Sequence, residues 1–172
     1  IFSRLYSTNA YFVGGTYVQA EGASASCFWD INAGPVPTFA NCTFIVNTPM
    51  TSFIRGIQAT YTNCTFIAKD TIDLIAMSAK GNGTAVAFNG CYFYNIIPNV
   101  IEGVTVTYTD CHFDKASDIA QAGGYIAYTG ETVTLTVKGE TYAFAAKLYA
   151  AGEVGLIDWG FGMKEYWAIG AK

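Results

Sequence analysis

Charge is scarce in this chain of 172 residues: Asp, Glu, Lys and Arg make up 13% of the sequence, and histidine occurs once. The nine basic residues form no stripe, so we expect no nucleic-acid partner. Apolar stretches are short and interrupted by polar residues, so no membrane-spanning helix is predicted. The sequence has no Cys-x-x-Cys pair and no histidine cluster, so neither a zinc site nor any other cofactor is expected.

The chain is instead rich in a short repeat. It reads as an apolar or aromatic residue, a spacer, a turn-type residue, a variable position, a small or ring-bearing residue, and an aromatic. The copies span 12–17, 39–44, 61–66, 88–93, 108–113 and, more weakly, 137–142. Their third positions are 14, 41, 63, 90, 110 and 139, which gives steps of 27, 22, 27, 20 and 29 residues. A period in this range is typical of a solenoid, in which each unit buries its apolar face on the next.

The third position of the repeat predicts a sharp corner. It is always a residue type that tolerates positive φ: Gly14, Asn41, Asn63, Gly90, Asp110 and Gly139. Apolar and Thr residues alternate on either side of it, as expected of strands with one buried face. Units of this length are too short for a βαβ crossover. They suit one coil of a parallel β-helix, an all-β fold.

In such a coil, equivalent residues of successive units stack on one another. Phe44, Phe66, Phe93 and Phe113 are predicted to form an internal aromatic column flanked by Tyr17 and Tyr142. Cys42, Cys64, Cys91 and Cys111 are predicted to form a second buried column of free thiols, because stacked parallel side chains have poor geometry for disulfides.

The Asn-Cys-Thr-Phe blocks at 41–44 and 63–66, with their variants at 90–93 and 110–113, give the chain a family likeness. It resembles the right-handed parallel β-helix (pectate-lyase-like) superfamily, which includes pectate lyases, pectin methylesterases, phage tailspikes and bacterial surface proteins. The resemblance covers roughly residues 10–145. It implies a fold rather than one activity, since the repeated residues are internal and corner residues.

The predicted organisation is a parallel β-helix of about six coils over residues 1–145, followed by a C-terminal cap or subunit-docking segment over 146–172. Trp159, Phe161, Tyr166 and Trp167 are the candidate interface residues of that segment. The Ala-rich stretch 143–151 is predicted to be a short helix. Periodicity leaves open whether residues 72–77 form a third strand or a helical turn.

Several polar groups are candidates for chemistry. Asp70, Asp73, Asp114 and Asp118 follow the repeat at similar offsets, and an enzyme that cleaves polysaccharides would use such carboxylates. Solvated loop charges are the plainer interpretation of these four residues. The single histidine, His112, is predicted to face outward.

Two further surface features are candidates for modification or binding. Asn41, Asn63 and Asn82 begin Asn-x-Thr patterns and are candidate glycosylation sites. Outward Thr rows (Thr60, Thr62, Thr105, Thr107, Thr109, Thr132, Thr134 and Thr136) are predicted to form one flat face, which would suit sugar or ice; high β-propensity explains them equally well.

The sequence therefore favours a non-enzymatic structural module of an extracellular or cell-surface assembly, such as a fibre, a surface protein or a phage-tail-like component. Its expected partners are copies of itself or neighbouring modules, and carbohydrate is a further candidate. The alternatives are a polysaccharide lyase or glycosidase, and a sugar- or ice-binding β-helix.

Overall fold

The computed structural model describes residues 10–19, 29–30, 37–47, 52–55, 59–75, 85–98, 100, 105–114, 124–128, 132–137, 140–150 and 165–169. This part of the chain is all-β and contains no helix. Its strands are β1 (Tyr11–Val13), β2 (Thr16–Gln19), β3 (Trp29–Asp30), β4 (Thr38–Ala40), β5 (Thr43–Val46), β6 (Ser52–Arg55), β7 (Ala59–Thr62), β8 (Thr65–Ile75), β9 (Ala85–Asn89), β10 (Tyr92–Ile97), β11 (Thr105–Thr109), β12 (Cys111–Phe113), β13 (Gly124–Tyr128), β14 (Thr132–Val137), β15 (Glu140–Ala150) and β16 (Glu165–Ile169).

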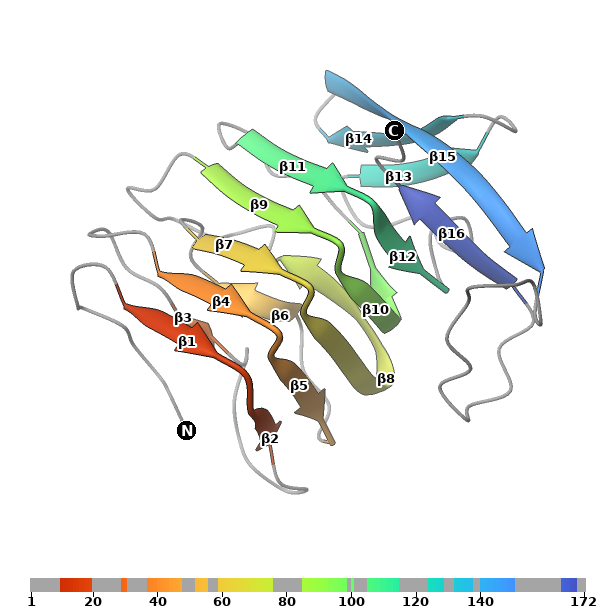
Figure 1. Cartoon of the computed structure of the whole chain (residues 1–172). Helices are drawn as coiled ribbons and strands as arrows, with labels where there is room; N and C mark the ends of the chain where they lie inside the picture. The colour runs from red at the N-terminus through yellow and green to blue at the C-terminus, as the bar shows by residue number, and fades with distance from the viewer. Residues whose placement is uncertain are drawn as a thin grey trace.

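The strands that precede each corner form one parallel sheet in the order β1-β4-β7-β9-β11 (Figure 1). The first aromatic position of each repeat is in register with the next. Phe12 lies opposite Phe39, Phe39 opposite Tyr61, Tyr61 opposite Phe88, and Phe88 opposite Tyr108. Because side chains on a strand alternate between faces, these aromatics all point to the same side of the sheet.

The strands that follow each corner pair in the same way, β2 with β5, β5 with β8, β8 with β10 and β10 with β12, all parallel. Here Tyr17, Phe44, Phe66, Phe93 and Phe113 are in register. Five copies of the repeat therefore occupy five successive levels, each made of a strand, a corner and a strand. This confirms the predicted parallel, in-register stacking for these copies.

Five of the six predicted corners have the predicted backbone conformation, and the sixth, Gly139, lies outside the described residues. φ is +71° at Gly14, +56° at Asn41, +51° at Asn63, +62° at Gly90 and +50° at Asp110. At four of these corners the backbone N–H donates to a carbonyl on the next level: Gly14 to Ala40 (2.8 Å), Asn41 to Thr62 (2.9 Å), Asn63 to Asn89 (2.8 Å) and Gly90 to Thr109 (2.8 Å). The corner thus turns the chain without interrupting the hydrogen bonds between levels.

A third row of parallel strands starts after a second bend. β3 pairs with β6, and Ser52 and Ile54 of β6 lie opposite Asp73 and Ile75 at the end of β8. The end of β10 joins this row, with Ile97 opposite Asp73. Residues 72–75 are therefore strand, which resolves the open alternative there; Ala76 and Met77 lie outside the described residues.

The parallel pairing ends at β12. Strands β13, β14, β15 and β16 pair antiparallel with one another, and β16 also pairs antiparallel with β12. The sixth copy of the repeat falls on β14 and β15, where Val137 lies opposite Glu140, so the prediction that it forms a sixth parallel coil is wrong. Antiparallel pairing already begins at residue 124, before the predicted boundary at 145. The assignment of 146–172 as a cap or docking segment stays a prediction.

The helix predicted over 143–151 is also wrong, because residues 140–150 form the single strand β15. This strand has a partner on each side, β14 and β16. The backbone bonds made to two neighbours outweigh the high helix propensity of alanine, which amounts to less than about 1 kcal/mol per residue.

The corner at Gly90 generates a test of the stacking. A Cβ added there would lie 2.5 Å from the side-chain oxygen of Asn63 on the neighbouring level, whereas a Cβ at Gly14 would meet nothing within 4 Å. Both positions have positive φ, so both pay the cost of the left-handed backbone, about 1–2 kcal/mol. We expect Gly90→Ala to lower the free energy of unfolding in urea clearly more than the matched control Gly14→Ala. Equal losses would mean that the Asn63 side chain does not pack over Gly90.

Candidate functional site

Two columns of aromatic rings run through the five levels and form the centre of the core. The first contains Phe12, Phe39, Tyr61, Phe88 and Tyr108, and its successive rings stack at centroid distances of 4.8, 4.9, 5.1 and 5.4 Å. The second contains Tyr17, Phe44, Phe66, Phe93 and Phe113, with distances of 5.3, 5.0, 4.8 and 4.2 Å. The predicted phenylalanine column is thereby confirmed, with Tyr17 at one end of it.

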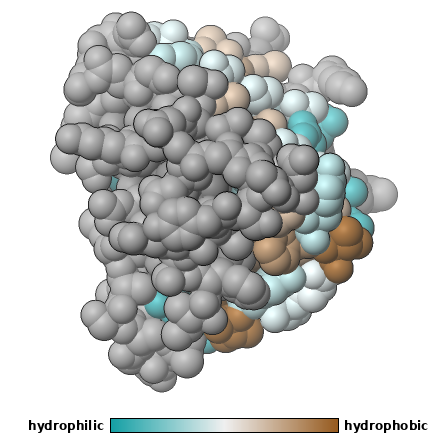
Figure 2. Space-filling view, turned by 90° about the vertical axis from the view of Figure 1, so that its left-hand side faces the viewer, coloured by the Kyte–Doolittle hydropathy of each residue, from teal (hydrophilic) through white to brown (hydrophobic). Residues whose placement is uncertain are grey.

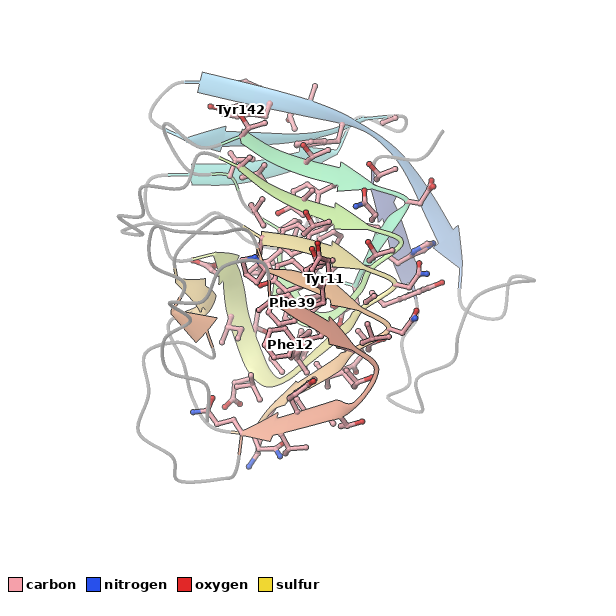
Figure 3. All side chains as sticks on the ribbon, turned by 60° about the vertical axis from the view of Figure 1, so that its left-hand side comes forward. Tyr11, Phe12, Phe39 and Tyr142 are labelled. Atoms are coloured by element: carbon pink, nitrogen blue, oxygen red, sulfur yellow. The ribbon has the colours of Figure 1, made fainter. Side chains whose placement is uncertain are left out.

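The first column was not predicted, although the aromatic residues at the first position of the repeat are its sequence signal. Rings of the two columns meet edge to face, as Phe39 does with Phe44 at 5.7 Å and Phe88 with Phe93 at 5.4 Å. Figure 3 shows Phe12 and Phe39 on neighbouring levels and Tyr142 at the other end of the molecule, where it is half-buried against the core.

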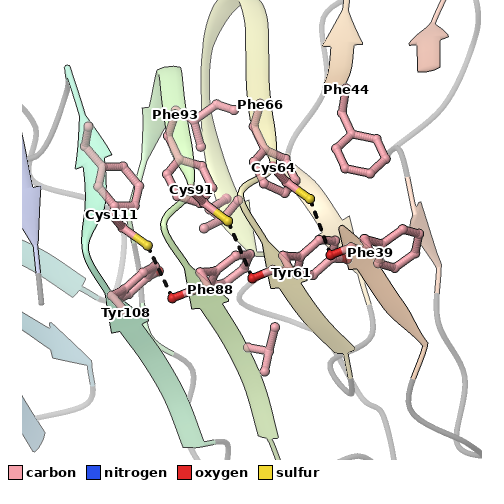
Figure 4. Packing of buried hydrophobic residues seen from close by; sticks show 14 of the residues in the cluster. Phe39, Phe44, Tyr61, Cys64, Phe66, Phe88, Cys91, Phe93, Tyr108 and Cys111 are labelled. Atoms are coloured by element: carbon pink, nitrogen blue, oxygen red, sulfur yellow. Dashed lines mark hydrogen bonds between the residues drawn. The ribbon is translucent and has the colours of Figure 1, made fainter. Parts of the chain in front are cut away.

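The cysteine column is confirmed as well, since Cys42, Cys64, Cys91 and Cys111 are buried and free. Each thiol contacts the level before it. Cys64 Sγ donates to Phe39 O (3.5 Å), Cys91 Sγ to Tyr61 O (3.6 Å) and Cys111 Sγ to Phe88 O (3.3 Å) (Figure 4). Cys42 Sγ lies 3.6 Å from Phe12 O and 3.3 Å from Gly14 O.

The thiols of Cys42, Cys64 and Cys91 are held in their protonated form. The hydrogen bond with Cys91, together with burial, raises the pKa of Cys64. Burial is the main cause of the raised pKa of both Cys42 and Cys91. Since the thiolate is the reactive form of cysteine, a raised pKa makes these three thiols poor nucleophiles.

The candidate carboxylates are only partly brought together. Asp70 is exposed and Asp73 is half-buried, both on β8, and burial raises the pKa of Asp73. Asp114 lies two levels further along the stack and accepts a hydrogen bond from the backbone N–H of Asn95 through Oδ1 (2.9 Å). Asp118 lies outside the described residues. Cleavage of a polysaccharide by these groups stays a prediction.

Asn95 is a polar residue that the sequence analysis missed. Its φ is +54°, and it sits where the register between β10 and β8 shifts. Its side-chain Nδ2 donates to Ala68 O (3.0 Å) and lies 3.4 Å from Lys69 O. Its backbone N–H donates to Asp114, which follows β12. Asn95 on β10 is thereby bonded to the levels of both β8 and β12 at this second bend. No second Asn occurs at an equivalent position in the repeat, so no periodic signal marks this position.

His112 lies on the outer face of β12, as predicted, but it is only half-exposed. Its ring stacks on Tyr92 of the preceding level at a centroid distance of 4.7 Å. Its Nδ1 is buried and has no hydrogen-bond partner among the described residues. Burial lowers the pKa of His112, and the nearby Asp110 carboxylate offsets part of this effect.

The outward Thr residues do not form one continuous face, so this prediction is wrong. Thr60 lies opposite Ala87, which lies opposite Thr107, and Thr62 is separated from Thr109 by Asn89 in the same way. Residues 132, 134 and 136 are on β14, which belongs to the other sheet. The rows that an ordered ligand such as ice would need are therefore interrupted.

The remaining candidates lie at the corners and near the C-terminus. Asn41 and Asn63 are exposed at positive-φ corners, while Asn82 lies outside the described residues. Trp159 and Phe161 also lie outside them. Tyr166 and Trp167 belong to β16, opposite Tyr149 and Leu148 of β15, and Trp167 also lies opposite Phe113 of β12. Glycosylation and docking at these positions stay predictions.

No family model, curated protein or solved structure matches this chain. Within the described part of the chain, no three His, Cys, Asp or Glu side chains are grouped to hold a metal ion. No helix there is long and apolar enough to cross a membrane.

The core generates a prediction at Tyr61, whose hydroxyl is completely buried and has no hydrogen-bond partner among the described residues. An unsatisfied buried polar group costs about 1–3 kcal/mol. We expect Tyr61→Phe to keep the ring stack and raise the free energy of unfolding by about 1 kcal/mol. Tyr108→Phe, in the same column, is the matched control and should give no such gain. A destabilised Tyr61→Phe would show that the hydroxyl has a partner after all.

His112 generates a prediction on pH. The unfolded chain takes up a proton on histidine near pH 6.5, whereas the folded chain does so only at lower pH. As the pH falls below about 6.5, the unfolded state therefore binds more protons and the free energy of unfolding decreases. His112→Phe should keep the stack on Tyr92 and remove this dependence.

Urea unfolding of both proteins between pH 7.5 and 5.5 isolates the effect, because the carboxylates contribute equally to each. The stability of the unaltered chain relative to His112→Phe should decrease toward low pH. A difference that stays constant would contradict a lowered pKa.

Proposed function

We propose that this chain is a non-enzymatic structural module of an extracellular or cell-surface assembly, for example a fibre, a surface protein or a phage-tail-like component, and that it self-associates. In this proposal the stacked levels are coils of a right-handed parallel β-helix related to the pectate-lyase-like superfamily. Right-handed connections between parallel strands are the general rule, and the Asn-Cys-Thr-Phe blocks carry the resemblance.

The observation that supports the proposal most is the pair of unbroken aromatic columns through five levels. Rings stacked at the spacing of neighbouring strands make a stiff element in which each level is stabilised by the next. Stiffness along one axis is what a fibre or surface module requires, and the fold can supply it without any catalytic group.

Polar side chains support the same interpretation because they hold levels together. Asp114 and Asn95 tie three levels at the second bend. The buried thiols contact the carbonyls of the preceding level. The exposed corner residues Asn41 and Asn63 remain open to a glycan, as expected for a protein outside the cell.

The test is the assembly state of the purified chain. We expect light scattering and sedimentation to give a mass well above the 18.5 kDa of one chain, rising with concentration. Negative-stain images should show elongated particles. A chain that stays monomeric up to its solubility limit would contradict the proposal, as would the release of sugar products from pectin or alginate.

A further inference from the structure

The outer face of the first level differs from that of the other levels. Among the described residues, the exposed large hydrophobic side chains are Tyr11 (74% exposed), Val13 (75%) and Val18 (56%). All three lie on β1 and β2. We call these three residues the first-level patch. Seen from the side on which β1 and β2 lie, the described surface shows hydrophobic residues interspersed with hydrophilic ones (Figure 2).

The register shows that this patch is not a continuation of the rows behind it. The row of Tyr11 continues as Thr38, Thr60, Ala87 and Thr107. The row of Val13 continues as Ala40, Thr62, Asn89 and Thr109. Large apolar side chains thus give way to small or polar ones from the second level onward.

The row of Val18 stays apolar or aromatic, with Ile45, Ile67 and Tyr94, but these side chains are half-buried. Among the described residues, exposure of large apolar side chains is therefore confined to the first level. Tyr11 and Val13 share the exposed face of β1, and exposed apolar side chains that cluster on a surface commonly mark an interaction site.

Charge indicates which partner fits. The chain has a net charge of −4, so two copies repel each other over most approaches. Residues 10–19, which contain the whole patch, include no charged residue and no proline. Lysine and proline are what proteins commonly use to keep the end strands of sheets from associating, and β1 and β2 are end strands of their sheets among the described residues. Two copies that meet through this uncharged patch therefore bring no like charges of residues 10–19 together.

We propose that the first-level patch is the contact between two copies of this chain, arranged by a twofold axis so that the same surface is used on both. Such an isologous interface needs a self-complementary, neutral and apolar surface. The patch has these properties, and it lies at one end of both sheets. The inference rests on the proposed self-association and identifies the surface that mediates it.

The test places a charge in the patch. In a twofold contact Tyr11→Lys brings two like charges close together, so we expect the dissociation constant for two copies, measured by sedimentation, to rise at least tenfold. Thr60→Lys is the matched control, two levels along the same row, and should leave association unchanged. Circular dichroism and urea unfolding establish that both variants are folded. If Tyr11→Lys fails to fold, Val18→Lys replaces it.

The outcomes separate the two proposals. If the unaltered chain associates and Tyr11→Lys behaves like Thr60→Lys, the first-level patch is not the contact, while self-association stands. If the unaltered chain is monomeric, the proposed function itself fails, and the patch then faces a partner of another kind.

Discussion

Stacking of equivalent side chains at the spacing between strands is the constraint on which the rest of this structure depends. Parallel strands lie about 4.7–4.9 Å apart, and the stacked rings of the two columns have centroids 4.2 to 5.4 Å apart. A flat ring fills this interval without strain, and a thiol beside it is small enough to contact the carbonyl of the preceding level. The corner residues must then turn the chain at the same point on every level, which only positive φ achieves here.

The parts of the fold that could be predicted from the sequence are those repeated in it. Asn41 and Asn63 recur with their Cys and Phe neighbours, so the corner, the buried Cys row and the buried Phe row could be predicted. Asn95 also has a positive φ and bends the chain. It has no equivalent in the other copies of the repeat, so no periodicity in the sequence predicts this bend. The alternating Val and Thr residues of β14 fit a parallel or an antiparallel partner equally well. The alanines of β15 favour a helix until two neighbouring strands are present, and the sequence does not show those neighbours.

The candidate chemistry was harder to predict because it depends on what each polar group contacts. Asp114 looked like one of several scattered carboxylates, yet it accepts the backbone N–H of Asn95. His112 was readable as outward-facing, but its stack on Tyr92 and its buried Nδ1 depend on the preceding level and on burial, which one sequence does not give.

The antiparallel pairing of β16 with β12 closes one end of the parallel stack. Parallel stacking in the second sheet cannot continue past β12 on that side, because the hydrogen-bonding edge of this strand is already used by β16. A chain of this design can therefore lengthen during evolution only by duplicating a unit upstream of β12. A unit inserted between two existing levels would have an aromatic ring above and below it, so the number of levels is open to change while the end at β12 stays the same.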